Sequence, residues 1–354
     1  MTAKSTSDAI LQAVDVLNRG GLVAFPTETV YGLGADASNP DAIQAIYAAK
    51  GRPSNHPVIV HVDKPSQMWR WINVSPKTKA LAQQLVAAFW PGPLTLIFKR
   101  HSSVPASVSG GQDTIGIRCP SHPIAHALLV AFASTRGERL AGIAAPSANR
   151  FGHVSPTRAQ HVVDEFADLV AQGLPVLDGG DSEVGIESTI LDLSRIDQGH
   201  GVALLRPGGI EASAIEAIIG EPLQSPNGQA PRVSGSLKAH YSPRTPMQLC
   251  DFDVLQVLAL DSNFATNNHD EWALVLRQSQ VEQARAMVPS SAKVSLIALP
   301  DDPMMYARQL YAQLRELDQG QFFRIVWLSV PEGQAWDAVR DRLTRAAAAF
   351  EGRD

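Results

Sequence analysis

Two cationic residues, Lys50 and Arg52, flank Gly51 in the stretch YAAKGRPSNHPVIVHV, which spans residues 47–62. One interpretation is structural: a glycine suits the left-handed end of a helix, and cations near a helix C-terminus stabilise its dipole. The other is chemical: a turn stiffened by proline would hold the two cations in place for an anionic ligand. Taken alone, these residues favour the structural interpretation, because charge by itself is weak evidence for a site.

Further polar residues stand at the expected ends of strands or in loops. Thr114 and Arg118 lie four positions apart in TIGIRCP, so they share one face of a strand. The others come from PTETVYG, PSANRFGHVSPT, GIESTI and LLRPG: Thr27, Glu28, Thr29, Tyr31, Ser147, Asn149, Ser155, Thr157, Ser188, Thr189 and Arg206. Singly, hydroxyl groups cap helices, asparagines form turns and arginines lie along apolar surface. Together, the cations and hydroxyls predict a polyphosphate-binding site in an otherwise lightly charged region.

Several familiar catalytic motifs are missing from the sequence. There is no G-x-x-x-x-G-K-[ST], G-x-G-x-x-G, H-E-x-x-H or G-x-S-x-G. Gly32-x-Gly34 has Ala37 where a dinucleotide fingerprint needs its third glycine, so we expect a loop with close backbone contacts. His122 and His126 could share a helix face, but no third ligand of the right kind follows them. The sequence therefore predicts anion binding without a P-loop and without a metal held by protein ligands.

Length and composition limit the class of protein. With 354 residues the chain should form about two domains, and 45% hydrophobic against 18% charged residues allows a core in each. The net charge of -5 creates no field that would attract nucleic acid or anionic membrane, so direct tRNA binding is not expected. Cys119 and Cys250 suggest neither a disulfide framework nor a zinc cluster. MTAKSTSDAI lacks a signal-peptide core and no apolar run could span a bilayer, so we expect a soluble, cytoplasmic protein.

Residues 7–210 mix helices and strands without a regular alternation. Spacing and capping signals predict helices from Ser7 or Asp8 to Gly20-Gly21, from Pro40 or Asp41 to Gly51, over KTKALAQQLVAAFW, near 122–133, and after Ser155-Pro156. Strands are predicted in LVAFPTETVYGLG, where a strand leads into a glycine-rich loop, and in VIVHV, LTLIFKR, TIGIRCP, GIAAPSA, PVLDGG, STILDLS and VALLRPGG. This irregular order favours a mixed α/β sheet.

A change of composition marks a second domain. The segment GEPLQSPNGQAPRVSGS, which follows Ile219, is rich in Pro, Gly and Ser and is typical of a linker. Beyond it, the apolar strands WALVLR, KVSLIALP and FRIVWLSV alternate with helices. One of these helices carries a predicted apolar face of Met304, Ala307, Leu310, Leu314 and Leu317. The alternation predicts a small parallel α/β domain.

Several long motifs can now be taken together. PTETVYGLGADA, KGRP…HPVIVHV, WPGPLTLI, IGIRCPSHP, PSANRFGHVSPT and GIESTILDL occur in this order and resemble the YrdC-like family over residues 7–210. The linker, LKAHYSPRTP and the C-terminal α/β domain resemble the two-domain threonylcarbamoyl-AMP synthases. This resemblance implies a mixed twisted sheet with flanking helices at 1–212, a linker or lid at 213–245, and a smaller Rossmann-like parallel-sheet domain at 246–354.

The resemblance also implies an activity. Members of the family convert L-threonine, bicarbonate or CO₂, and ATP into L-threonylcarbamoyl-AMP and pyrophosphate. The product serves the formation of N6-threonylcarbamoyladenosine on tRNA, where a separate enzyme carries out the transfer. Mg²⁺ is expected to accompany ATP without a dedicated set of protein ligands, although Glu28 or Glu187 could contribute.

The family motifs assign expected roles to individual residues. Lys50 and Arg52 match the K-x-R part of the signature and are expected to be catalytic by holding the ATP phosphates. The other expected nucleotide-binding residues are His56, Thr114, Ser147, Asn149, Ser155, Arg206 and Tyr241. The expected threonine-binding residues are Thr29, Tyr31, His61, Arg118, Ala145 and Ser188, and Arg118 is expected to clamp the substrate carboxylate.

Two alternatives concern single residues, and one departure from the family pattern concerns the linker. His61 could be a core histidine whose ring is satisfied, and Ser188 could merely bond at a sheet edge. Ser234-Gly235 stands where family members often carry Pro-Gly, which weakens the expectation of a lid in which Tyr241 folds over the nucleotide.

Two alternatives concern the whole protein. Hydrogenase-maturation carbamoyltransferases contain a similar domain, but they also carry zinc-binding cysteine clusters that this chain lacks. An RNA-binding module is disfavoured by the acidic balance and by the lack of aromatic residues interleaved with Lys and Arg.

Overall fold

The computed structural model describes residues 5–137, 139–260, 271–290 and 292–351, which form two compact units. The first contains the chain up to Phe151 together with Ser155–Ser236, and the second contains Gly152–Val154 and the chain from Leu237 onward. The segment predicted as a linker, 213–245, is thus divided between the units after Ser236. Residues 1–4 and 352–354, which the predicted domain bounds include, lie outside the described residues.

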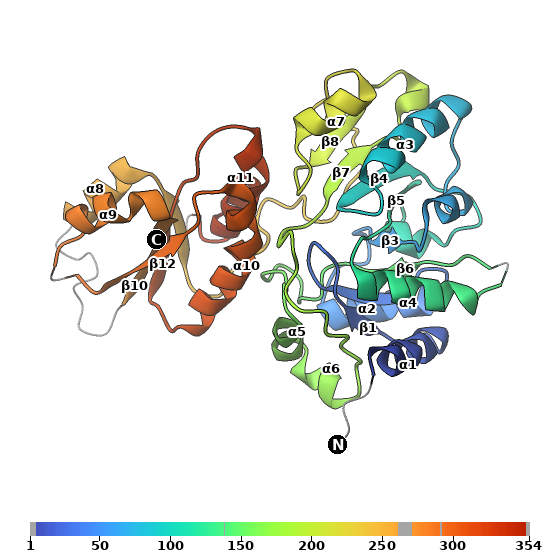
Figure 1. Ribbon diagram of the computed structural model, residues 1–354, viewed down its shortest axis with the longest axis horizontal. Helices are drawn as coiled ribbons and strands as arrows, with labels where there is room; N and C mark the ends of the chain where they lie inside the picture. Colours follow the sequence, from blue (N-terminus) through green and yellow to red (C-terminus); the bar gives the residue numbers. More distant parts are fainter. Residues whose placement is uncertain (1–4, 138, 261–270, 291, 352–354) are drawn as a thin grey trace. The chain divides into compact units, whose positions relative to one another are not determined.

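The described part of the first unit is built on one sheet of eight strands in the order β1-β2-β6-β3-β5-β4-β7-β8 (Figure 1). The pairs β3–β5 and β4–β7 are parallel, whereas the other neighbours are antiparallel. The strands are β1 (Val23–Phe25), β2 (Gly32–Asp36), β3 (Ile59–His61), β4 (Leu94–Lys99), β5 (Thr114–Arg118), β6 (Ile143–Ala144), β7 (Thr189–Asp192) and β8 (Ala203–Arg206). The predicted mixed α/β sheet is confirmed.

Helices flank this sheet, with α1 beside α4 and α3 beside α7 in Figure 1. The α-helices are α1 (Thr6–Asn18), α2 (Pro40–Lys50), α3 (Pro76–Phe89), α4 (Pro123–Ser134), α5 (Ala159–Glu165), α6 (Ala167–Ala171) and α7 (Ala212–Ile219). Short 3₁₀ turns cover η1 (Pro65–Arg70), η2 (Ala106–Ser109) and η3 (Ile196–Gln198). Helix α7 occupies the start of the segment that was predicted to be a linker.

Two predicted helix starts are wrong. Ser5 caps α1, since its hydroxyl accepts the backbone N–H of Asp8 at 3.2 Å, so this helix begins before Ser7. Helix α5 begins at Ala159 rather than directly after Ser155-Pro156. There the Ser155 hydroxyl donates to Glu187 and the Pro156 carbonyl accepts from Tyr31, so both groups serve tertiary contacts instead of a helix start.

The glycine-rich segment after PTETVY is a strand rather than the predicted irregular loop. Strand β2 runs antiparallel to β1, and a Cβ at Gly34 would lie 2.7 Å from Cε1 of Phe25. The same Cβ would lie 2.8 Å from Cγ2 of Ile143. The predicted close contact is therefore confirmed, but it occurs inside a sheet, where glycine is uncommon. PVLDGG, by contrast, makes only an isolated bridge through Val176 to Ala24 and is not a strand.

Helix α2 ends as its sequence predicts. Asn39 caps its start, and Gly51 closes it in the left-handed conformation with φ of 62°. A residue with a Cβ is strained in that conformation, which explains the glycine. The helix end fixes the backbone directions from which Lys50 and Arg52 leave the turn.

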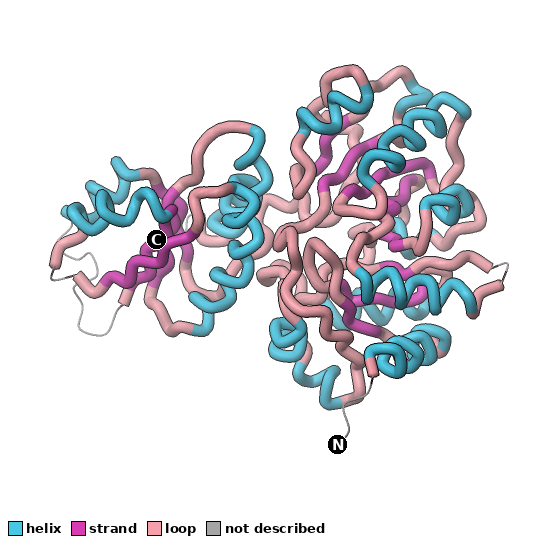
Figure 2. Tube along the Cα trace, in the orientation of Figure 1, coloured by secondary structure: helices cyan, strands magenta, loops and turns pink. Residues whose placement is uncertain are grey.

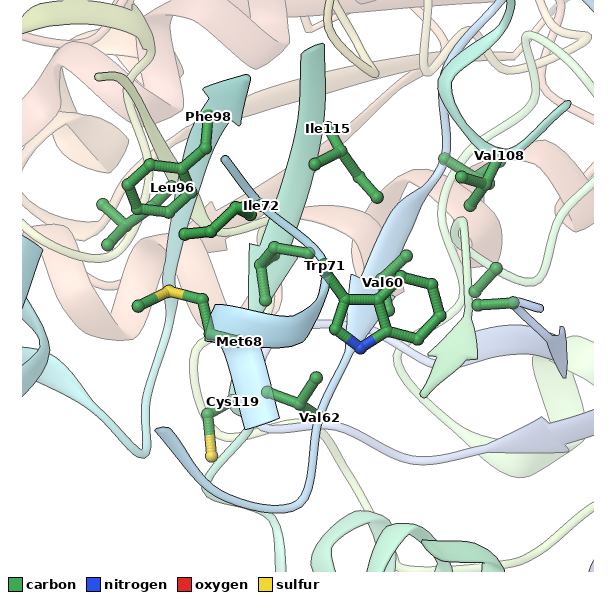
Figure 3. Close-up of a cluster of buried hydrophobic side chains, with 14 of the residues drawn as sticks. Val60, Val62, Met68, Trp71, Ile72, Leu96, Phe98, Val108, Ile115 and Cys119 are labelled. Atoms are coloured by element: carbon green, nitrogen blue, oxygen red, sulfur yellow. The ribbon is translucent and has the colours of Figure 1, made fainter. Parts of the chain in front are cut away.

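Alternation along the central strands separates an apolar face from a polar one. Val60 of β3, Ile115 of β5 and Phe98 of β4 belong to a buried apolar cluster with Met68 and Trp71, as Figure 3 shows. Their neighbours along the strands point to the opposite face. Those neighbours include His61, Thr114 and Arg118, so the core on one side positions the polar residues on the other.

The described part of the second unit contains a four-stranded sheet in the order β11-β10-β12-β9, and all its pairs are parallel. Helices α8 and α9 cover one face, and α10 and α11 cover the other (Figures 1 and 2). The bounds are β9 (Met247–Cys250), α8 (Phe252–Leu260), β10 (Trp272–Arg277), η4 (Gln278–Gln280), α9 (Val281–Met287), β11 (Val294–Leu299), α10 (Pro303–Gln319), β12 (Arg324–Leu328) and α11 (Gln334–Ala347). The predicted parallel α/β domain is confirmed.

Two details of the second unit differ from the sequence prediction. Met304 was assigned to the buried face of α10 but is 78% exposed, because it lies in the first turn of the helix. Tyr306 and Tyr311 are buried on this helix instead, together with Ala307, Leu310, Leu314 and Leu317. Strand β9 and helix α8 were not predicted. In the part of the chain that the structure describes, no helix is long and apolar enough to cross a membrane.

We expect Gly34→Ala to destabilise the first unit by about 1–3 kcal/mol, because the added methyl group collides with Phe25 and Ile143. Equilibrium unfolding in urea measures the change. Gly228→Ala is the matched control: a Cβ there meets no described atom within 4 Å, and the expected change is below about 0.5 kcal/mol. Equal effects of the two substitutions would contradict the packing argument.

Candidate functional site

Arg118 is a paired cation at the end of β5. Its Nη1 donates to Oγ1 of Thr29 at 2.8 Å, and its Nη2 lies 2.7 Å from Oε1 of Glu28. The hydroxyls of Thr27 and Thr29 lie 2.8 Å apart, and Thr27 donates to the Val30 carbonyl at 2.6 Å. Because the Thr27 proton is used there, Thr29 donates to Thr27 and accepts from Arg118. The loop after β1 is therefore attached to the end of β5.

His61 lies beside Arg118, because the two residues are register partners in the parallel pair β3–β5. Burial, and secondarily the charge of Arg118, depress the pKa of the His61 imidazole to about 3, so the ring is neutral near pH 7. Its Nδ1 is buried without a hydrogen-bond partner among the described residues. The alternative of a core histidine explains the burial but not this unsatisfied nitrogen.

Ser188 lies at the centre of a second buried network. Its hydroxyl is 2.7 Å from that of Thr95 on β4, and Nη2 of Arg206 donates to it at 3.2 Å. The Arg206 Nε and Nη2 also donate to the Ser188 carbonyl, at 3.1 and 2.8 Å. Ser188, an expected threonine-binding residue, thus contacts Arg206, an expected nucleotide-binding residue. Its hydroxyl bonds to two side chains, so it does more than bond at a sheet edge.

Lys50 is buried and holds the Ser147–Asn149 loop. Its Nζ donates to the Ser147 carbonyl at 2.6 Å and to the Asn149 carbonyl. Burial, followed by the charge of Arg52, lowers its pKa well below the ordinary value. Two parts of the K-x-R…S-x-N signature that are almost a hundred residues apart in sequence therefore meet in space. The cap interpretation and the ligand interpretation of this turn are both compatible with the geometry.

The segment 232–234, which we call the strap, covers a largely apolar part of the sheet that includes Thr114, Ile97 and Ile190. Gln112 holds it twice: its Oε1 accepts the Arg232 N–H at 2.8 Å and its Nε2 donates to the Arg232 carbonyl at 3.0 Å. Val233 packs against Ile97 and Ile190. The pocket between strap and sheet is only about 10 Å³, room for roughly one water molecule.

The strap also contacts two of the expected phosphate-binding cations. Nη1 of Arg206 donates to the Ser234 carbonyl at 2.9 Å. Arg52 reaches the Ser234 hydroxyl at 3.4 Å and donates to the Pro57 carbonyl at 2.8 Å. An anion that binds both arginines would therefore compete with Ser234.

The remaining expected nucleotide-binding residues of the first unit surround these cations. The His56 ring packs edge-on against Phe151 at 5.4 Å, and Arg52 lies 6.0 Å above the same Phe151 ring. Burial and neighbouring Arg52 lower the pKa of His56. Ser155 donates to Oε1 of Glu187 at 2.6 Å, and the Glu187 charge acts on Lys50. Thr114, at the other end of β5 from Arg118, lines the pocket beneath the strap, as the spacing of four predicted.

Three expected site residues have other surroundings. The Tyr31 hydroxyl donates to the Gly180 carbonyl at 2.8 Å, so it is used within the protein, and burial raises its pKa to about 12. Ala145 contributes backbone, since its N–H donates to the Ile59 carbonyl at 2.9 Å. Tyr241 belongs to the second unit, where Cζ of Arg342 lies 5.3 Å from its ring. The roles expected for these three residues stay predictions.

The described residues contain no group of three or more His, Cys, Asp or Glu that could hold a metal ion. His122 caps α4 through Nδ1, which accepts the Ile124 N–H at 3.2 Å. Asp36 pairs with Arg136 at 2.9 Å rather than facing a ligand site. Cys119 and Cys250 are both buried free thiols.

Sequence reasoning missed three residues of this region. Thr95 is a hydroxyl residue inside an apolar strand, and its alternation with Leu94 and Leu96 could have indicated that it faces the polar side. Glu28 was named among the polar loop residues, but the only role considered for it was that of a metal ligand. Gln112 gave no local signal, because its partner lies 120 residues away.

Comparisons with known proteins show which family the chain resembles. Residues 15–208 match the family described as "Telomere recombination", and residues 210–348 match "Threonylcarbamoyl-AMP synthase, C-terminal domain". The chain is 35% identical to threonylcarbamoyl-AMP synthase of Bacillus subtilis over 97% of its own length and 94% of that protein. It is 32% identical to the Schizosaccharomyces pombe synthase, covering 98% and 90%. The crystal structure of Pyrococcus abyssi Sua5 complexed with L-threonine superposes with a TM-score of 0.80 at 31% identity, covering 98% and 95%.

We expect His61 to make stability depend on pH. Its pKa is about 3 in the folded protein and about 6.5 in an unfolded chain. Below pH 6.5 the unfolded state therefore binds a proton that the folded state does not, and stability is lost as the pH falls towards 3. Urea unfolding should show a pH slope up to about 1.4 kcal/mol per unit steeper in the wild type than in His61→Gln. Equal slopes would show that His61 is not buried as a neutral ring.

Proposed function

Because the chain belongs to the family of two-domain threonylcarbamoyl-AMP synthases, we propose that the polar face of the first sheet is the site of its reaction. The protein makes L-threonylcarbamoyl-AMP from L-threonine, bicarbonate or CO₂, and ATP, and it releases pyrophosphate. The product supplies N6-threonylcarbamoyladenosine formation on tRNA. The observation that carries our assignment of the site is that six motif segments meet in three pairs, through the contacts of Arg118 with Thr29, Lys50 with Ser147 and Arg206 with Ser188.

The reaction brings several anions together. The amine of threonine must be carboxylated, and the resulting N-carboxylate must attack the α-phosphorus of ATP and displace pyrophosphate. Charge repulsion and orientation dominate such a barrier, so fixed cations supply most of the acceleration. Lys50 and Arg52 hold the phosphates, with Arg206 completing the cationic wall.

The expected residues divide the site into two halves. Arg118 takes the carboxylate of threonine, while Thr29, His61 and Ser188 surround the rest of the amino acid, with Tyr31 and Ala145 as packing. This half draws support from the relative from P. abyssi, whose structure was determined with L-threonine. The nucleotide half in the first unit consists of Lys50, Arg52, His56, Thr114, Ser147, Asn149, Ser155 and Arg206.

Mg²⁺ enters this scheme as part of the substrate MgATP. It would offset the triphosphate charge, and the protein would supply cations instead of a carboxylate cage. Among the described carboxylates, Glu187 is suited to contribute because its charge acts on Lys50 and it accepts from Ser155. The strap then covers the site before ATP binds. ATP displaces Ser234 from Arg52 and Arg206 as it enters.

The product is a mixed anhydride that water destroys, so it has to reach a second enzyme quickly. We propose that it passes to a separate tRNA threonylcarbamoyl transferase in the cytoplasm. Small molecules are then the substrates of this chain, and tRNA is bound by the transferase.

The direct test incubates the protein with ATP, bicarbonate and threonine and looks for the mass of threonylcarbamoyl-AMP. Lys50→Ala and Arg52→Ala should each lower turnover by at least about 100-fold, because a cation facing the transferred group is lost. Circular dichroism and thermal unfolding establish that both variants are folded. Lys79→Ala is the control and should keep full activity, because Lys79 lies on α3 and its ammonium group stands over the Trp69 ring of η1. Wild-type turnover in Lys50→Ala and Arg52→Ala would mean that these residues only stabilise the end of helix α2 and do not bind ATP.

Gln112→Ala tests the strap. It removes two hydrogen bonds to Arg232, each contributing about 0.5–1.5 kcal/mol, so Ser234 competes less well for the arginines. We expect the KM for ATP to fall by about fivefold and proteolysis near Arg232 to become faster. Gln84→Ala on the exposed side of α3 is the control. An unchanged KM for ATP together with faster proteolysis would mean that the strap does not oppose ATP.

A further inference from the structure

Glu28 carries a carboxylate that the scheme above leaves without a task. The residue is 3% exposed, and its Oε1 lies 2.7 Å from Nη2 of Arg118. Neither Oε1 nor Oε2 accepts a hydrogen bond from any described residue. A buried carboxylate oxygen without a donor costs free energy, so such a group in a protein calls for an explanation, such as a catalytic role or a bound ligand or water that supplies the donor.

Arg118 is unsatisfied in a complementary way. Its Nη1 donates to Thr29, whereas its Nε is buried without a hydrogen-bond partner in the described part of the chain. The pair Glu28–Arg118 is neutral overall. Beside the ion pair between Oε1 and Nη2, it offers Oε2 as an acceptor and Nε as a donor that no described residue engages. A phosphate would be repelled by Glu28, and a metal cation would be repelled by Arg118. A zwitterion with an ammonium and a carboxylate close together satisfies both groups.

The other titratable groups facing this pair do not change that reading. His61 is neutral near pH 7 because its pKa is about 3. Burial, followed by the charges of Asp63 and Glu28, raises the pKa of the Cys119 thiol to about 12, so it stays protonated. Asp63 has Lys64 at 3.9 Å. Charge at the pair is therefore set by Glu28 and Arg118 themselves.

We propose that Glu28 binds the α-ammonium group of the amino-acid substrate while Arg118 binds its carboxylate, and that Glu28 then removes one ammonium proton. In this step an N–H bond breaks, its electron pair stays on nitrogen, and the proton forms an O–H bond with the Glu28 carboxylate. The freed lone pair is the nucleophile for carboxylation. This inference rests on the proposed function, and it adds the group that converts the stored ammonium form of the substrate into its reactive amine.

The test uses Glu28→Gln in the full chain, which keeps the size of the side chain and removes its charge. At neutral pH we expect kcat/KM for threonine to fall by about 100-fold or more. The loss should shrink by nearly tenfold per pH unit towards the pKa of the free substrate ammonium, because the variant must take up threonine that is already deprotonated. Asp36→Asn removes another buried carboxylate that pairs with an arginine, Arg136, and should leave the pH slope unchanged.

A binding measurement separates proton removal from a merely structural role. In calorimetry without ATP, the wild type should prefer threonine to 2,3-dihydroxybutanoate, which lacks the amine, and Glu28→Gln should lose this preference. If Glu28→Gln does not fold, Glu28→Asp replaces it, and it should keep the preference while kcat falls.

Each remaining outcome has a defined meaning. A wild-type pH slope in Glu28→Gln, or an unchanged preference for threonine, overturns the inference. If Glu28→Asp loses the preference for threonine over 2,3-dihydroxybutanoate, or keeps the wild-type kcat, the inference is also overturned. Failure of the wild type to form threonylcarbamoyl-AMP would instead overturn the proposed function, so the two failures are distinguishable.

Discussion

Arg118 lies almost fully buried at the end of a strand whose other face belongs to the apolar core, and a charge in that position has to be compensated. The compensation comes from the loop after β1, through the Thr29 hydroxyl and the Glu28 carboxylate. This loop is in turn tied to later parts of the chain, since the Glu28 carbonyl accepts the Val184 N–H at 2.7 Å. The demand of one buried cation thus brings three distant segments together.

The same principle applies to the other cations of the site. Lys50 satisfies backbone carbonyls at Ser147 and Asn149, and Arg206 satisfies the carbonyl of Ser188 and that of Ser234. Each cation therefore supports the loop that carries its neighbouring site residues. The proposed site therefore needs no P-loop: cations that tertiary contacts hold in place take the role that the backbone N–H groups of a glycine-rich turn have in a P-loop.

The strap occupies two of the cations that are expected to bind phosphate. In the structure, Ser234 occupies Arg52 and Arg206, and Val233 covers the apolar part of the sheet face between them. The contacts are few and neutral on the strap side, whereas a triphosphate would be charged. Charge-assisted hydrogen bonds are stronger than neutral ones, which is why the proposed function has a triphosphate compete with Ser234 for the two arginines.

Much of the fold and the chemistry was determined by the sequence alone. The left-handed glycine after α2, the alternation of TIGIRCP and the apolar strands of the second unit are local signals, and the structure confirms them. The long motifs determined the family. Predictions that depend on tertiary partners failed. The glycines of β2 suggested a loop instead of a strand, and Met304 is exposed although its spacing places it on the apolar face of α10.

Only the tertiary structure decided which groups are satisfied and which are not. Whether the His61 ring is bonded, whether Glu28 has a donor and which hydroxyl meets Thr95 all depend on residues far away in the chain. Local sequence determines the backbone conformation and the periodic pattern of buried side chains, because both arise from residues that are neighbours in the chain. Hydrogen-bond satisfaction in a core arises from segments that meet only after folding, so it could be read from the folded chain alone.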